Sequence, residues 1–196
     1  MGSFPCTGII RKSCTTHSLS ISARSSNPLP MTTDTPAPET KTLYFGYGSN
    51  LWLAQMAIRC PQNKVIGLEI LRGWKWFING RRYANIVPSP EDLVYGMVYE
   101  LIPSDVASLD HHEEVPQIYT KKMMEIESQI AGNVQALVYI DTGIVEEGEP
   151  KKKYVYRISL GISDAVMRGL PRCYIDKYIC RFIVPGGWEE VVEVLG

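Results

Sequence analysis

Segments in which apolar and polar residues alternate dominate the sequence after residue 41. Alternation with a period of two is the pattern of a β-strand with one buried face. The clearest segment, residues 93–101, is also rich in valine and tyrosine, which favour strands. Residues 119–127 and 134–141 flank a Gly132-Asn133 turn and are predicted to pair as a hairpin. Shorter strands are predicted at residues 43–46, 65–71, 74–78 and 85–90.

Helical segments lie between these strands. A helix over residues 50–59 is predicted to begin at an Asn50 N-cap and to end before Pro61. Ser104 is the expected N-cap of a helix over 103–113. A longer helix is predicted at 154–168, and a short one at 174–182. The expected fold class is α+β: a mixed, largely antiparallel, barrel-like sheet with helices packed around it.

Residues 1–41 differ from the rest and are predicted to be a disordered N-terminal extension. They are rich in Ser, Thr and Pro, and three basic residues, Arg11, Lys12 and Arg24, precede the first acid, Asp34. Such a segment resembles an organelle transit peptide, so mitochondrial import by residues 1–30 is an alternative to the cytoplasmic location that we expect. The other interpretation is a dispensable tail, since Met31 could itself begin a chain. Residues 42–196 are predicted to form one domain.

Composition excludes several classes of protein. The formal net charge is -1, which predicts no nucleic-acid partner and no attraction to an anionic membrane. No apolar run approaches the roughly 20 residues that span a bilayer. Five cysteines without a CxxC pair indicate free thiols in a reducing compartment. With only three histidines, no zinc or other metal site is predicted.

Common catalytic motifs are missing from the sequence. It has no GxxxxGK[ST] phosphate loop, no GxGxxG after the first strand and no GxSxG elbow. A histidine-dependent hydrolase would have to use His111 or His112, and this alternative stays open. Otherwise a carboxylate or a tyrosine must carry the acid/base role.

The segment from Gly46 to Asn50 lies where the first strand turns into a helix. Its two glycines allow the backbone to approach a ligand closely, and its amides could bind a carboxylate or a developing oxyanion. From these residues alone, an ordinary strand–helix turn with a Ser or Asn cap is the favoured explanation.

The helix after Pro103 places Val106, Leu109, Asp110 and Glu113 on one face. Glu113 lies at the helix end beyond the apolar residues, where partial burial and the helix dipole would raise its pKa toward that of a general base. The alternative is a rim carboxylate paired with a lysine. The side chains of His112 and Glu114 are expected to face solvent.

Aromatic residues are the remaining candidates. Tyr154 begins the long helix, and its hydroxyl could lie at the rim of a site or simply complete the packing. Tyr119 and Tyr139 are strand tyrosines with the same two interpretations. Three tryptophans are expected in the core: Trp52, Trp74 and Trp76.

Together these segments resemble the γ-glutamylcyclotransferase family over residues 42–183. The stretch LYFGYGSNL at 43–51 is similar to the opening motif of the family, and LDHHEEV at 109–115 to the segment that holds its catalytic glutamate. The resemblance extends to NIVPSP at 85–90, LVYGMVY at 93–99, Tyr154 seven residues before Gly161, and Gly169-Leu170-Pro171 with Tyr174.

The resemblance implies a lyase that needs no cofactor. The α-amine of a small γ-glutamyl substrate attacks its own γ-carbonyl, forms 5-oxoproline and releases an amine, as in glutathione metabolism. By resemblance Glu113 is the catalytic residue. The implied substrate-binding residues are Tyr44, Phe45, Gly46, Tyr47, Gly48, Ser49 and Tyr154.

Two departures from the family pattern affect the expected substrate. Glu114 stands where the family usually has glycine, and Pro116 to Ile118 precede Tyr119 in place of small residues. Two alternatives therefore stay open: the same chemistry on a glutathione adduct or another γ-glutamylated intermediate of a secondary-metabolite pathway, or a catalytically silent binding protein. A homodimer is also left open.

Overall fold

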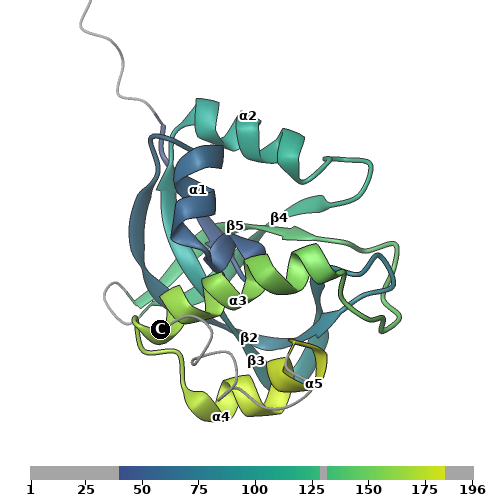
Figure 1. Ribbon diagram of the computed structural model, residues 1–196. Coiled ribbons are helices and arrows are strands. Elements are labelled where there is room, and N and C mark those ends of the chain that lie inside the picture. Colours follow the sequence, from purple (N-terminus) through teal and green to yellow (C-terminus); the bar gives the residue numbers. More distant parts are fainter. Residues whose placement is uncertain (1–39, 129–131, 184–196) are drawn as a thin grey trace, which may run out of the picture. The chain divides into compact units, whose positions relative to one another are not determined.

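A closed five-stranded barrel organises the structure, which is a computed structural model and describes residues 40–128 and 132–183 (Figure 1). The strands are β1 (Thr42–Gly46), β2 (Lys64–Ile78), β3 (Ala84–Leu101), β4 (Thr120–Ser128) and β5 (Gly132–Ile140). Their order around the barrel is β1-β3-β2-β4-β5. All neighbouring pairs are antiparallel except β1 and β5, which pair in parallel and close the barrel. The predicted α+β class and barrel-like sheet are confirmed.

Two long strands replace four predicted short ones. The segments predicted at 65–71 and 74–78 are both parts of β2, which continues through a register shift between Arg72 and Trp74. Gly73 lies at this irregularity with a φ of 78°, a conformation that glycine adopts without strain. Similarly, 85–90 and 93–101 both belong to β3. The predicted hairpin is confirmed as β4 and β5.

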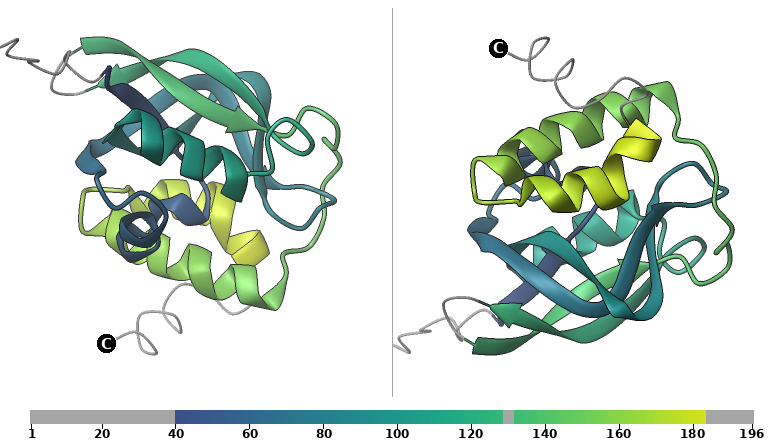
Figure 2. Two further views of the ribbon diagram at one scale, coloured as in Figure 1. Left: turned by 90° about the horizontal axis from the view of Figure 1, so that it is seen from above. Right: turned by 90° about the horizontal axis from the view of Figure 1, so that it is seen from below.

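The helices follow the predicted segments, with ends that differ by up to three residues. They are α1 (Leu53–Arg59), α2 (Pro103–His112), α3 (Lys152–Val166), and a C-terminal helical segment of α4 (Arg172–Tyr174), η2 (Ile175–Ile179, a π-helix) and α5 (Cys180–Ile183). A 3-10 turn, η1 (Ser49–Leu51), precedes α1. Figure 2 shows α3 and the C-terminal helical segment together on one side of the barrel.

Both predicted N-caps are wrong. Trp52 and Ile102 precede α1 and α2, and neither helix has a side-chain cap. The proline at the start of α2 needs no cap partner because it has no N–H. Asn50 instead directs its buried side chain to tertiary partners.

The core fills the barrel and the space beneath the helices. Its largest fully buried side chains include Trp76, Tyr99 and Phe45. Trp52 and Trp74, which were expected in the core, are only partly buried. Ile158, Gly161, Ile162 and Ala165 of α3 face inward as predicted.

The predicted N-terminal extension and the predicted free cysteines lie only partly within the described residues. The predicted extension lies outside the described residues except for its last two positions, and so do Cys6 and Cys14. Cys60, Cys173 and Cys180 have free thiols. No helix in the described part of the chain is long and apolar enough to cross a bilayer.

Candidate active site

The loop between β1 and η1 is held from beneath by buried aromatic side chains. The Trp76 indole donates a hydrogen bond to the Tyr47 carbonyl (3.0 Å), and the Tyr99 hydroxyl donates to the Asn50 carbonyl (2.6 Å). The Tyr47 hydroxyl donates to the Tyr139 carbonyl on β5 (2.6 Å). Because these groups come from three strands of the barrel, the sheet fixes the path of the loop.

Gly48 allows α3 to approach this loop closely. A Cβ atom at position 48 would lie 3.0 Å from the Tyr154 hydroxyl and 3.3 Å from the Ala84 Cβ. The Ala84 amide donates a hydrogen bond to the same hydroxyl (3.1 Å). The buried Tyr154 ring is thus fixed between β3 and the loop, as a residue that positions a ligand must be.

Glu113 follows the last residue of α2, and its side chain turns toward the loop. Its Oε1 accepts hydrogen bonds from Asn50 Nδ2 (2.9 Å) and Arg59 Nη1 (3.2 Å). The side chain is only 17% exposed. Within the described residues no hydrogen bond reaches the other oxygen, Oε2, which is therefore available to a ligand.

A polar network holds Asn50 and Arg59 in place. Asn50 Nδ2 also contacts the Tyr44 hydroxyl (2.7 Å), and its Oδ1 accepts from Gln55 Nε2 and Arg59 Nη1, both at 2.9 Å. Buried polar groups with satisfied partners are held rigidly. The network therefore fixes the orientation of the Glu113 carboxylate.

Burial raises the pKa of Glu113 above its ordinary value, because removal from water disfavours the charged form. Attraction to Arg59, the hydrogen bond from Asn50 and attraction to Arg157 oppose this shift without cancelling it. A carboxylate with a raised pKa is suited to proton transfer near neutral pH.

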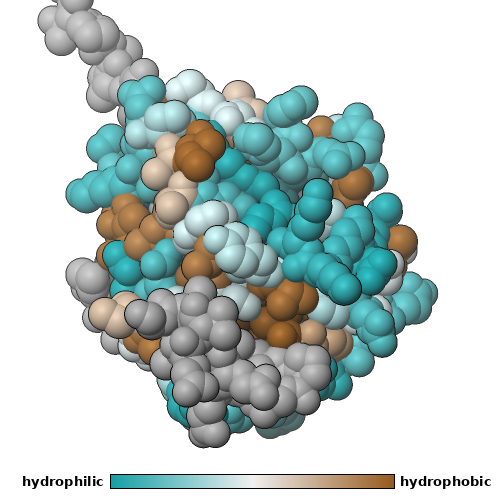
Figure 3. All heavy atoms as spheres, viewed as in Figure 1, coloured by the Kyte–Doolittle hydropathy of each residue, from teal (hydrophilic) through white to brown (hydrophobic). Residues whose placement is uncertain are grey.

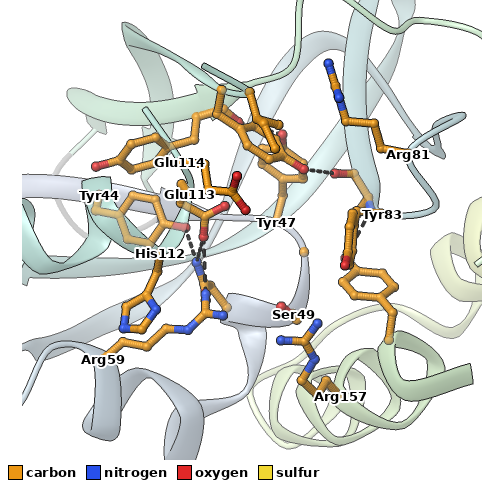
Figure 4. Close-up of a pocket in the computed structure, with 17 residues that line it drawn as sticks. Tyr44, Tyr47, Ser49, Arg59, Arg81, Tyr83, His112, Glu113, Glu114 and Arg157 are labelled. Carbon is orange, nitrogen blue, oxygen red and sulfur yellow. Dashed lines mark hydrogen bonds and ion pairs between the residues drawn. The ribbon is translucent and has the colours of Figure 1, made fainter. Parts of the chain in front are cut away.

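These groups surround one cavity of about 190 Å³ (Figure 4). Figure 4 shows Glu113 and Tyr44 together on one side and Arg157 reaching toward the cavity from α3. Of the predicted site residues, those that line the cavity are Tyr44, Tyr47, Gly48, Ser49, Glu113 and Tyr154. Tyr119 and Tyr139 line it as well.

Phe45 and Gly46 do not line this cavity. Phe45 is fully buried, and its ring lies over Gly96, where a Cβ would come within 2.4 Å of it. Side chains alternate along a strand, so Tyr44 and Phe45 on β1 cannot face the same side. Gly46 packs against Asn50 and Tyr44. The expected role of Phe45 as a side chain that binds substrate is therefore corrected to a core role.

His112 and Glu114 are exposed but also line the cavity, so the expectation that they turn away is only half right. Glu114 has a φ of 50°. This left-handed conformation favours glycine and is strained for other residues. It accounts for the glycine that is usual at this position in the family that the sequence resembles.

Asn50 was expected within the ligand-binding loop, but the roles of three side chains of the site, those of Asn50, Arg59 and Arg157, were not predicted from the sequence. Asn50 was expected to be an N-cap, Arg59 the end of a helix, and Arg157 had no role. Arg59 also replaces the lysine expected as the partner of Glu113. Among residues 40–128 and 132–183 no three His, Cys, Asp or Glu side chains are grouped so that they could hold a metal ion.

The family model described as "Gamma-glutamyl cyclotransferase, AIG2-like" matches residues 44–157, which include the loop, Glu113 and Tyr154. The chain belongs to this family. A curated human relative named gamma-glutamylcyclotransferase is 27% identical, over 83% of this chain and 92% of the relative. A mouse protein of the same name is 27% identical, over 69% of this chain and 76% of the relative.

Solved structures show the same fold. One named gamma-glutamyl cyclotransferase superposes with a TM-score of 0.65 at 26% identity, covering 80% of this chain and 98% of its own. A human structure described as an uncharacterized protein gives a TM-score of 0.64 at 26% identity, covering 80% of this chain and 99% of its own.

Proposed function

We propose that this protein is a γ-glutamyl cyclotransferase that converts γ-glutamyl compounds into 5-oxoproline and a free amine. The observation that carries this proposal is the free Oε2 of Glu113, which lies in a polar cavity beside the glycine-containing loop. Membership of the cyclotransferase family supports it. We further propose that the reaction takes place in the cytoplasm and uses no cofactor.

The chemistry is an intramolecular exchange of one amide for another. The substrate α-nitrogen forms a bond to the γ-carbon, and the bond from that carbon to the leaving nitrogen breaks. Two protons move from the α-ammonium to the leaving nitrogen, so atoms and charge balance without water. Holding the amine against the carbonyl lowers the barrier, because the free glutamyl chain adopts many conformations in which these two groups do not meet.

Each group in the cavity has a role in this scheme. Glu113 Oε2 carries the two protons, one after the other, from the substrate α-nitrogen, whose ammonium pKa is about 8, to the leaving nitrogen. The amides of the loop residues that line the cavity, Tyr47, Gly48 and Ser49, stabilise the developing oxyanion. Tyr154, fixed by Ala84 and Gly48, orients the glutamyl chain.

The acid limb of the pH profile should depend on Arg59. Glu113 must be ionised to act as a base, so kcat/KM should rise with pH as the carboxyl loses its proton. Arg59 lowers the pKa of Glu113. Arg59→Gln is therefore expected to move the acid limb of kcat/KM to higher pH, which steady-state rates across a pH series would measure.

Arg72→Gln is the matched control, since Arg72 pairs with Glu127 on the surface of the barrel. Its acid limb should coincide with that of the wild type. An unmoved or lowered limb in Arg59→Gln would show that another group controls the profile.

The direct test is mass spectrometry of the products from three substrates: γ-glutamyl-alanine, glutathione and a bulky glutathione S-conjugate. Release of 5-oxoproline from any of them supports cyclotransfer, and the relative rates identify the leaving amine. Preference for the conjugate would favour the alternative of a modified glutathione intermediate. Folded protein that binds these compounds without turnover would instead indicate a silent binding protein.

A further inference from the structure

Arg157 is a cation of the cavity for which the reaction scheme has no use. Two other arginines line the cavity, and each has a carboxylate partner: Arg59 pairs with Glu113 at 3.2 Å, and Arg81 with Asp141 at 2.7 Å. Among the described residues Arg157 makes no hydrogen bond or ion pair. Its guanidinium carbon lies 5.7 Å from the centre of the Tyr154 ring. A partly buried guanidinium without an anion is ready to bind one.

Arg157 lies at the border between the cavity and a second, outer groove. Tyr83, Tyr154 and Arg157 line both spaces, and the Tyr83 and Tyr154 rings are in edge-to-face contact at this border. The outer groove is otherwise lined by Lys151, Lys152, Lys153 and Tyr156. Figure 3 shows hydrophilic side chains gathered over the beginning of α3, from which this groove is built.

The outer groove is positively charged. Four of its seven lining residues are lysine or arginine, and none of the seven is acidic. Lys151 is held by Tyr83, because its Nζ lies 3.0 Å from the Tyr83 hydroxyl and 4.4 Å from the centre of the ring. Clustered charge of one sign favours a ligand group of the opposite sign.

The position of Glu113 decides which part of the substrate meets Arg157. If the α-amine reaches Glu113 Oε2, the glutamyl chain fills the inner cavity. Arg157 lies on the side of the cavity away from Glu113 (Figure 4), so we expect the atoms beyond the scissile bond to extend toward it. We propose that Arg157 is a specificity residue that selects substrates whose leaving amine carries a carboxylate, with the lysines of the outer groove adding to the attraction. This inference rests on the proposed cyclotransferase function.

The test compares two substrates that differ only in this group. γ-Glutamyl-ethylamide is γ-glutamyl-alanine without the carboxylate. Loss of a charge-assisted hydrogen bond should lower kcat/KM for γ-glutamyl-alanine about tenfold to a hundredfold in Arg157→Gln. The rate with γ-glutamyl-ethylamide should change little. Both are measured on the pH plateau, because Arg157 also lowers the pKa of Glu113.

Two further variants complete the design. Arg157→Lys keeps the charge and should restore part of the preference for the carboxylate. Arg168→Gln removes an exposed cation that donates a hydrogen bond to the Asp164 carbonyl, and should keep the wild-type ratio. Melting curves for every variant show that the protein is folded.

An equal fall with both substrates would place Arg157 at the glutamyl carboxylate and overturn the proposal. Unchanged rates with both substrates would overturn it too. Absence of 5-oxoproline from both substrates in the wild type would be a different result, because it would reject the proposed function itself.

Discussion

Replacing Glu113 with glutamine is expected to lower kcat/KM for 5-oxoproline formation about 10²–10⁴-fold, the usual contribution of general acid–base catalysis. Glutamine has the same shape, and its oxygen can still accept the hydrogen bonds from Asn50 and Arg59. It cannot take a proton from the substrate ammonium. Steady-state kinetics with γ-glutamyl-alanine would measure the loss.

The same variant should remain folded. Burial raises the pKa of Glu113 even with Arg59 present, so the folded state favours the protonated carboxyl. Between the ordinary value of 4.5 and the raised pKa, the contribution of this group to stability therefore falls as pH rises. Glutamine removes that loss, and the melting temperature at neutral pH should equal or exceed that of the wild type.

Glu91→Gln is a suitable charge control, because Glu91 is an exposed residue of β3 outside the cavity. It should retain wild-type kinetics. A folded Glu113→Gln protein with near wild-type turnover would reject Glu113 as the acid/base residue.

Gly161→Ala should reduce both stability and activity. A Cβ at this position of α3 would lie 2.8 Å from the Leu51 Cβ and 2.8 Å from the Trp52 amide nitrogen. The backbone cannot move aside easily, so overpacking should cost about 1–3 kcal/mol. This cost opposes the roughly 1 kcal/mol that alanine gains over glycine within a helix.

Activity should fall as well, because the clash would displace α3, which carries Tyr154. It would also displace the turn at Leu51 and Trp52, which follows directly after the substrate loop. Displacement of a positioning group by about 1 Å can lower the rate roughly a hundredfold. Asp164 of α3 also accepts a hydrogen bond from the Leu53 amide (2.8 Å), so the displacement would strain a second contact. Circular dichroism melting and kcat/KM would measure the two effects.

Ser163→Ala on the same helix is the control, since Ser163 is only partly buried. It should keep both stability and rate. A higher melting temperature for Gly161→Ala would show that α3 and η1 do not pack as closely as described.

Local patterns predicted the elements of this fold well, because period-two alternation and turn residues act over a few positions. They predicted the β4–β5 hairpin and the inward face of α3. They also placed Glu113 at the end of its helix, where the structure has it. Gly73 suggested a break between two strands, whereas the chain keeps pairing through the bulge.

Contacts between distant segments could not be predicted in this way. Asparagine is a residue type that often caps helices, which is why Asn50 was predicted to be an N-cap. Its side chain instead contacts Tyr44 and Glu113, and Glu113 is 63 positions away in the sequence. Arg59 and Arg157 reach the cavity from different helices, and nothing in the local sequence marks them. Phe45 was misassigned because a motif was treated as a unit, although alternate side chains of a strand face opposite sides.

The most direct test of the account uses water enriched in heavy oxygen. The wild-type protein is incubated in this water with γ-glutamyl-alanine, and the masses of the products are measured by mass spectrometry. Cyclisation consumes no water, so the account predicts 5-oxoproline and alanine without the label. Glutamate carrying heavy oxygen would show that the bond is hydrolysed, as a hydrolase using His112 would do, and would contradict the proposed reaction.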